Sequence, residues 1–159
     1  MGGLMSLLKE IRMVDIGGKP DVLRIARAVG RIKLKSETIE RIRRGEIEKG
    51  DVRMTAQIAA IMAVKKTPEI VPLCHPIPIT GIDVDVNVRD HHVEVEVEVR
   101  SIGKTGVEME ALVGVSAALL AIWDMVKAYE KDEQGQYPYT VIEEIRVASK
   151  TKEPITRRK

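Results

Sequence analysis

Two stretches of the chain alternate apolar and polar residues. Between positions 82 and 88, isoleucine and valine alternate with Asp and Asn, and between 93 and 99, valine alternates with Glu. A period of two is typical of a strand that buries one face. The Asp90-His91 pair between the stretches fits a hairpin turn, so the pattern predicts two antiparallel strands with one acidic, solvent-facing side.

Other segments have the spacing of amphipathic helices, with apolar residues recurring every three or four positions. These predicted helices cover residues 36–45, 51–66 and 106–131. Ser36 and Asp51 are predicted to be the N-caps of the first two helices, because their side-chain oxygens can accept from free backbone amides. Gly45 is predicted to end the first helix, and Thr67-Pro68 the second.

Two more predicted strands, over 22–34 and 141–147, complete the order of elements. The order of strand, two helices, two strands, helix and strand is that of an α+β, ferredoxin-like fold, with an antiparallel sheet and helices packed on one face. The pattern predicts a single catalytic domain over 22–150. An N-terminal arm over 1–21 precedes it, and a basic C-terminal tail over 151–159 follows it.

The composition narrows the class of protein. The 159 residues are 44% hydrophobic, enough for one core, which lacks Phe and must therefore be built from aliphatic side chains. A net charge of +2 gives no general attraction to nucleic acid or to a membrane surface. Because Cys74 is the only cysteine and no secretion signal or membrane-spanning stretch is evident, we expect a cytoplasmic protein.

Polar residues on the last helix are the first candidates for chemistry. Asp124 and Lys127 are three positions apart, so they share a face and can form an ion pair. That pair is either an ordinary helical salt bridge or a catalytic carboxylate and ammonium. Glu108 and Glu110 lie near the start of the same helix, and sixteen residues separate Glu108 from Asp124.

The length of this helix limits how these residues can work together. Sixteen residues span about 24 Å of a straight helix, so one small substrate cannot touch Glu108 and Asp124 of the same chain. If both ends are functional, the site is either extended or formed by two subunits across a symmetric interface. We favour a site shared between two chains.

Several basic residues could bind phosphate. The GKTG turn at 103–106, with Lys104 and Thr105, precedes a helix and is either an anion cradle or a simple strand-to-helix turn. Lys49 also lies just before a helix start, and Lys65 and Lys66 lie at a helix end, where they could instead complement the helix dipole.

The segment over 70–80, IVPLCHPIPIT, is predicted to be a stiff loop, because its three prolines fix an extended path. His75 in this loop is the best general acid or base by intrinsic pKa, although an isolated histidine is more often structural. Cys74 beside it has no second cysteine pair nearby, which argues against a zinc site with spaced ligands.

Taken in order, these segments resemble one family. The blocks MVDIGGKPD (13–21), KGDV (49–52), KKTPEIVPLCHPI (65–77), GKTGVEMEAL (103–112) and WDMVKA (123–128) are similar to those of cyclic pyranopterin monophosphate synthases, also called molybdenum-cofactor biosynthesis protein C. The likeness covers about residues 13–131. The resemblance implies a ferredoxin-like subunit in a homohexamer, a trimer of dimers with active sites at the dimer interface.

The resemblance also implies the reaction and the site. The family's substrate is 3′,8-cyclo-7,8-dihydro-GTP, which is converted by acid–base chemistry into cyclic pyranopterin monophosphate and pyrophosphate without a redox cofactor. A Mg²⁺ ion on the phosphates is left open, and no protein-held metal is expected. By similarity the catalytic residues fall on Lys49, His75, Glu108, Glu110, Asp124 and Lys127. Residues that bind substrate or phosphate fall on Lys65, Lys66, Cys74, Lys104, Thr105 and Met109.

The chain departs from the family pattern at its end. The family usually ends in a glycine-rich KSGGKSG tail, whereas residues 149–159 here read SKTKEPITRRK, which leaves a phosphate role for Lys150 or Lys152 open. Inside the last helix Trp123 stands where Tyr is common, and Val113-Gly114 replaces Thr-Ala.

Three alternatives come from other classes. An RNA-binding module would need aromatic residues on the sheet, and the predicted strands contain none. A non-catalytic, nucleotide-binding oligomer would tolerate replacement of Asp124 and Lys127. A zinc-type GTP cyclohydrolase is the enzyme alternative, and the sequence lacks its spaced metal ligands.

Overall fold

The computed structural model describes residues 10–155. The first part of the predicted arm, 1–9, and the end of the predicted tail, 156–159, lie outside the described residues. The elements in chain order are β1 (Val22–Lys33), α1 (Ser36–Arg44), α2 (Val52–Lys65), α3 (Thr67–Ile70), β2 (Ile79–Val88), β3 (His92–Gly103), α4 (Glu108–Glu130) and β4 (Val141–Glu153).

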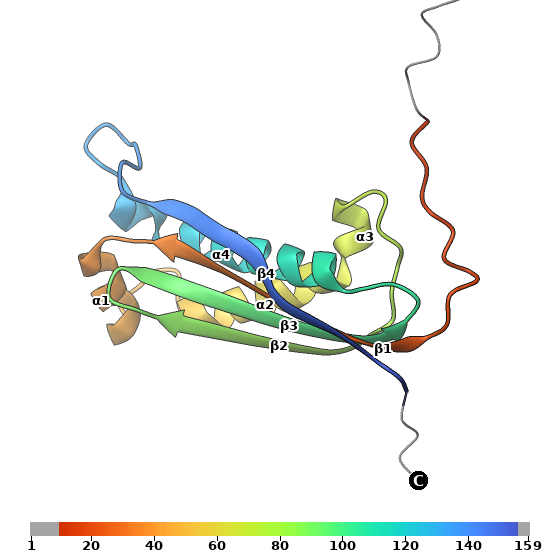
Figure 1. The fold of residues 1–159 in the computed structure, drawn as a ribbon. Helices are drawn as coiled ribbons and strands as arrows, with labels where there is room; N and C mark the ends of the chain where they lie inside the picture. The colour runs from red at the N-terminus through yellow and green to blue at the C-terminus, as the bar shows by residue number, and fades with distance from the viewer. Residues whose placement is uncertain (1–9, 156–159) are drawn as a thin grey trace, which may run out of the picture.

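The four strands form one antiparallel sheet in the order β2-β3-β1-β4, and α2 and α4 lie together along one face of it (Figure 1). The predicted α+β class with helices on one face is therefore confirmed. The β2–β3 hairpin closes where predicted, with Val88 opposite Val93 and the amide of Arg89 donating to the carbonyl of His92 at 2.9 Å.

The face of the sheet away from the helices is charged, as the alternation predicted. The glutamates of β3 point outward, where Arg27 contacts Glu96 and Glu98 at 3.1 and 2.8 Å. On the neighbouring strand pair, Arg100 lies 2.5 Å from both Asp83 and Glu98. These opposite charges on adjacent strands neutralise the acidic face.

The core between sheet and helices is aliphatic. Its buried hydrophobic side chains are Ala, Ile, Leu and Val with one methionine, Met125. Helix α2 turns its alanines inward against α4, while Met54, Ile58 and Met62, spaced four apart, lie more than half exposed on its outer side. Alanine lets the two helices approach closely, so the larger apolar residues form a stripe on the surface, here called the α2 stripe.

Local details differ from the sequence predictions at three places. Ser36 is the first residue of α1 and makes no cap, because Lys35 occupies that position. The chain does not stop being helical at Thr67 but forms the short helix α3, with proline in its first turn where no amide is needed. Strand β4 continues past 147 to Glu153, opposite Leu23, and so takes in the start of the predicted tail.

Helix α4 is the central helix of the fold. By length and composition alone it could cross a membrane, although the sequence was expected to hold no membrane-spanning stretch. However, it packs against α2 and three strands and buries the carboxyl side chains of Glu110 and Glu130. These contacts are those of a core helix in a globular domain.

Gly30 of β1 sets how closely α4 approaches the sheet. A Cβ atom built there would lie 2.8 Å from Val115 and 3.0 Å from Leu119 and Ile145, all on packed elements. We predict that Gly30→Ala lowers the free energy of unfolding by about 1–3 kcal/mol through overpacking. Guanidinium unfolding would test this, with Gly18→Ala as control because no atom lies within 4 Å of its Cβ position; equal stabilities would contradict it.

Candidate functional site

Lys49, Asp124 and Lys127 form a compact ionic cluster. The Asp124 carboxylate accepts from the Lys127 ammonium at 2.8 Å and from the Lys49 ammonium at 2.8 Å, through separate oxygens. Lys49 also donates to the backbone carbonyl of Asp124 at 2.9 Å. The spacing on α4 predicted the first pair, and the loop before α2 supplies the second lysine.

The charges of this cluster stabilise one another. Hydrogen bonds from Lys127 and then Lys49 lower the pKa of Asp124 to about 2, and the Asp124 carboxylate raises the pKa of Lys127. All three side chains are about half exposed in the single chain. In the single chain the pKa values of Asp124 and Lys127 therefore move away from neutrality. In this state Asp124 is a fixed anion and Lys127 a fixed cation.

A second cluster lies at the other end of α4, around Glu108. Its carboxylate accepts from the Lys150 ammonium of β4 at 2.9 Å. Arg24 of β1 and Lys152 join these residues in lining a cavity of about 190 Å³. The Nε of Arg24 is buried there, and no hydrogen-bond acceptor reaches it among the described residues. A basic hollow with an unused guanidinium donor suits an anionic ligand.

The pKa values of the two glutamates at this end of α4 are shifted in opposite directions. Burial raises the pKa of Glu110, which is only 2% exposed, and the nearby charge of Glu108 raises it further. For Glu108 itself, burial acts to raise the pKa, but the hydrogen bond from Lys150 and other contacts outweigh it and the net pKa is lowered. Two carboxyl groups whose pKa values are moved apart are suited to separate roles as acid and base.

The proline-rich loop reaches this second cluster. Burial and then the charge of Glu110 raise the pKa of the Cys74 thiol, which places Cys74 near that glutamate. Its neighbour His75 is partly buried and makes no hydrogen bond to a described residue. Cys74 therefore lies near the Glu108 end of α4.

Lys104 of the GKTG turn holds the N-terminal arm. Its ammonium donates to the backbone carbonyls of Lys19 at 2.7 Å and Gly17 at 3.3 Å. The Lys104 carbonyl accepts in turn from Arg24 at 3.2 Å, so the turn connects the arm to the basic cavity. Two of the three ammonium hydrogens of Lys104 are thereby used by the protein itself.

The remaining predicted residues are less constrained. Lys65 and Lys66 are exposed at the end of α2 and make no ion pair within residues 10–155. Thr105 is partly buried and Met109 is 40% exposed at the start of α4. Within residues 10–155, none of these four side chains makes a hydrogen bond or an ion pair with either cluster.

Gly106 controls the place of the Glu108 carboxylate. A Cβ at Gly106 would come within 1.9 Å of a carboxylate oxygen of Glu108, so that flexible side chain would have to move away. We predict that Gly106→Ala separates Glu108 from Lys150 and changes the pKa of Glu108, measured by carbon NMR titration. In the control Gly103→Ala, the added carbon meets only ordinary contacts at 3.4 Å or more, and the pKa of Glu108 should stay unchanged. An equal effect of both variants would contradict this reading.

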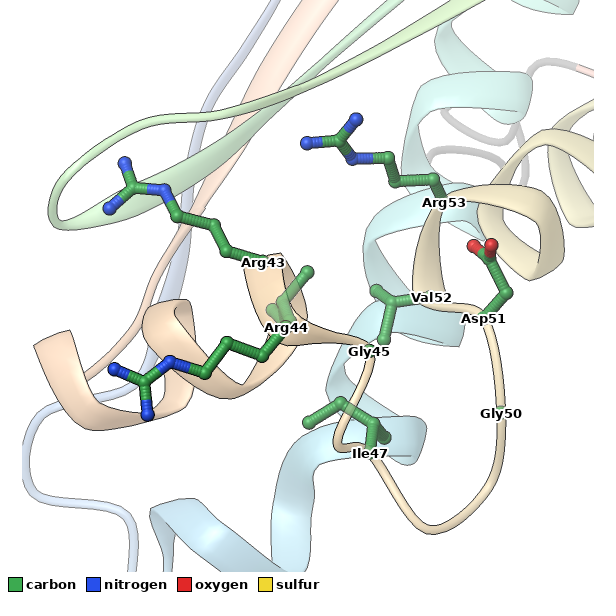
Figure 2. Close-up of a pocket in the computed structure, with 9 residues that line it drawn as sticks. Arg43, Arg44, Gly45, Ile47, Gly50, Asp51, Val52 and Arg53 are labelled. Carbon is green, nitrogen blue, oxygen red and sulfur yellow. The ribbon is translucent and has the colours of Figure 1, made fainter.

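A further hollow lies beside the Lys49 loop. It has a volume of about 500 Å³ and is lined by Arg43, Arg44 and Arg53 together with residues of the loop. Figure 2 shows that the three guanidinium groups do not converge on one point. Arg43 is already paired with Glu40 and Asp90, so this hollow is not a preformed anion site.

Known proteins are similar to almost the whole chain. Residues 13–153 match the model of the MoaC family. The chain is 65% identical over 145 residues to a probable cyclic pyranopterin monophosphate synthase of Pyrococcus furiosus, covering 91% of this chain and 93% of the relative. The chain belongs to the MoaC family. A probable cyclic pyranopterin monophosphate synthase of Methanosarcina mazei is 62% identical, covering 89% of this chain and 90% of the relative. Another, of Pyrococcus horikoshii, is 61% identical, covering 96% of this chain and 96% of the relative.

Two residues of the basic cavity in this MoaC-family chain, Arg24 and Lys150, were not among the predicted site residues. Arg24 was not singled out, because an arginine within an apolar strand resembles an ordinary surface residue. A phosphate role for Lys150 stayed open, because residues 149–159 depart from the family's glycine-rich tail. The sequence signal for Arg24 is its position between Leu23 and Ile25, where a charged residue interrupts an apolar run.

Proposed function

We propose that the two clusters are complementary halves of one active site, which rearranges 3′,8-cyclo-7,8-dihydro-GTP into cyclic pyranopterin monophosphate and pyrophosphate. Membership of the MoaC family makes the chain a cyclic pyranopterin monophosphate synthase, an enzyme of molybdenum cofactor biosynthesis. The observation that carries the assignment of the site is the pairing of lysines with carboxylates at both ends of α4.

General acid–base chemistry follows from the charge states of these groups. Glu110, whose pKa is raised by burial, can hold a proton and donate it to a nitrogen or oxygen of the reacting ring. Glu108, whose net pKa is lowered, stays a carboxylate and can accept one. The Asp124 anion orients the ammonium groups of Lys127 and Lys49 toward developing negative charge.

Expulsion of pyrophosphate needs positive charge on the leaving group. Arg24, Lys150 and Lys152 around the small cavity supply it, and the free Nε of Arg24 offers a donor that no described residue uses. A guanidinium binds phosphate oxygens through two parallel hydrogen bonds, which fits a triphosphate chain. Lys65, Lys66, Cys74, His75, Lys104, Thr105 and Met109 are proposed to complete the site around substrate.

The halves must come from different subunits. Glu108 and Asp124 are separated by about 24 Å along α4 of one chain, which exceeds the reach of one small nucleotide. We propose a homohexamer, a trimer of dimers, in which the dimer interface brings Asp124 of one chain near Glu108 of the other. The α2 stripe supports association, because three large apolar side chains in a row are exposed on the single chain. Burial at such an interface would also move the pKa values of Asp124 and Lys127 towards neutrality.

The alternative enzyme, a zinc-type GTP cyclohydrolase, differs from the proposed synthase in its need for a metal ion. A zinc-type cyclohydrolase needs a ligand set, and within the described part of the chain no three His, Cys, Asp or Glu residues group closely enough to hold a metal ion. The proposed rearrangement moves protons and displaces pyrophosphate, so it requires no redox cofactor. A cytoplasmic location is proposed, which the GTP-derived substrate and the single unpaired cysteine favour.

The deciding experiment is incubation of the purified protein with 3′,8-cyclo-7,8-dihydro-GTP. We expect one pyrophosphate and one cyclic pyranopterin monophosphate for each substrate consumed. GTP itself is the control and should give neither product. Hydrolytic opening of the imidazole ring of GTP with release of formate would favour the cyclohydrolase, and binding of the cyclic substrate without turnover would favour the non-catalytic oligomer.

A further inference from the structure

We propose that Tyr129 is a positioning residue that fixes the loop carrying Lys49. The hydroxyl of Tyr129, on α4, accepts a hydrogen bond from the backbone amide of Glu48 at 3.0 Å. Glu48 directly precedes Lys49, whose ammonium must reach the carboxylate and the backbone carbonyl of Asp124. The inference rests on the proposed function of Lys49.

The loop between α1 and α2 has few internal supports. Gly45 ends α1 in the left-handed conformation at φ 69°, and the loop then runs past Ile47 and Gly50 to Asp51, the N-cap of α2 (Figure 2). Within the loop the amide of Gly50 bonds to the carbonyl of Ile47 at 2.9 Å. The side chain of Ile47 is buried in the core, but hydrophobic contact does not fix the direction of the backbone.

The Glu48 amide has an unusual partner for a loop. Other backbone hydrogen bonds of this loop are short-range, whereas this one crosses 81 positions to a side chain of α4. Tyr129 is itself held from two sides. The guanidinium of Arg41 lies 5.0 Å from the centre of its ring, and the ring packs against the core.

This anchor shares a helix with the group that Lys49 must meet. Asp124 and Tyr129 are five residues apart on α4, so their backbone positions keep a fixed separation. Lysine has four rotatable side-chain bonds, and fixing its backbone reduces the conformations that compete with the paired one. Without the hydroxyl the loop keeps Ile47 buried, but the direction of the Lys49 side chain is no longer set.

The test is Tyr129→Phe in the full-length protein, which removes one oxygen and keeps the ring beneath Arg41. We expect the Glu48 amide to exchange with deuterium about three- to tenfold faster, since one hydrogen bond of ordinary strength is lost. Lys49 should react faster with an acetylating reagent, with exposed Lys131 as internal reference. Turnover at saturating substrate should fall by about three- to tenfold, by the same reasoning, with a smaller change in KM.

Tyr139→Phe is the matched control. It removes the same atom from a tyrosine whose ring lies 4.5 Å from the ammonium of Lys33 and whose hydroxyl bonds to no described residue. That variant should leave the Glu48 amide, Lys49 reactivity and turnover unchanged. A melting curve of both variants separates this local effect from general destabilisation, which would speed exchange throughout the chain.

The outcomes distinguish the two proposals. Unchanged exchange at Glu48 and unchanged reactivity of Lys49 in Tyr129→Phe would overturn the positioning role, whatever the turnover. Faster exchange and reactivity with undiminished turnover would uphold the positioning of Lys49 and count against its part in the reaction. If the native protein fails to convert the cyclic dihydro-GTP, the exchange and labelling results still decide the role of Tyr129.

Discussion

Lys127→Ala is expected to reduce turnover of 3′,8-cyclo-7,8-dihydro-GTP by about 10²–10³-fold, the range for loss of one group that stabilises developing negative charge. The ammonium lies 2.8 Å from the Asp124 carboxylate and is about half exposed, so its removal leaves no buried group without a partner. The variant should therefore fold and assemble normally. Asp124→Asn should have a similar effect, because an amide no longer holds both lysine ammonium groups by charge.

The control for this result is Lys131→Ala, which removes an exposed lysine one helical turn further along the chain. It should keep native turnover. The measurements are pyrophosphate release, circular dichroism and sedimentation velocity on all three variants. Retained turnover in Lys127→Ala or Asp124→Asn would reject the catalytic roles, and a lost fold would assign those residues to structure.

Glu130→Ala is expected to lower the free energy of unfolding by about 3–5 kcal/mol, the largest stability effect of any change discussed. The Glu130 side chain is fully buried at the end of α4, where it accepts from the hydroxyls of Thr38 and Thr140. It also accepts from the amide of Lys35 at 3.1 Å. Alanine would leave two buried hydroxyls and the part-buried amide of Lys35 without this acceptor, together with a cavity.

This carboxylate joins the start of α1, the end of α4 and the chain entering β4. Guanidinium unfolding monitored by Trp123 fluorescence gives the measurement. Glu133→Ala, at an exposed glutamate three positions later, should change stability by less than about 0.5 kcal/mol. A similarly small loss in Glu130→Ala would mean that water replaces the carboxylate at no cost.

Local patterns predicted the elements whose structure depends on nearby residues. The alternation in β2 and β3, the hairpin between them and the Asp51 cap, which accepts from the amide of Met54 at 2.9 Å, all follow from neighbours in sequence. The Asp124–Lys127 pair followed from helical spacing in the same way. Such contacts are fixed by backbone geometry alone.

Contacts between distant segments could not be read from the sequence. Which face of α2 is buried depends on how closely α4 approaches it, and small alanines rather than Met54 or Met62 permit that approach. Lys49 lies 75 positions before Asp124, and no local pattern links them. Lys104 looked free to bind phosphate, but the fold of the arm gives it carbonyl partners.

In the proposed shared site, each subunit would contribute to two different reaction centres, one at each end of α4. If the centres form between chains, a subunit carrying Lys127→Ala and one carrying Glu108→Ala are each inactive alone, yet a mixed pair contains one centre with neither lesion. Random re-association of equal amounts would then leave about a quarter of all centres intact. Two inactive preparations would regain activity when unfolded and refolded together, in the manner of genetic complementation.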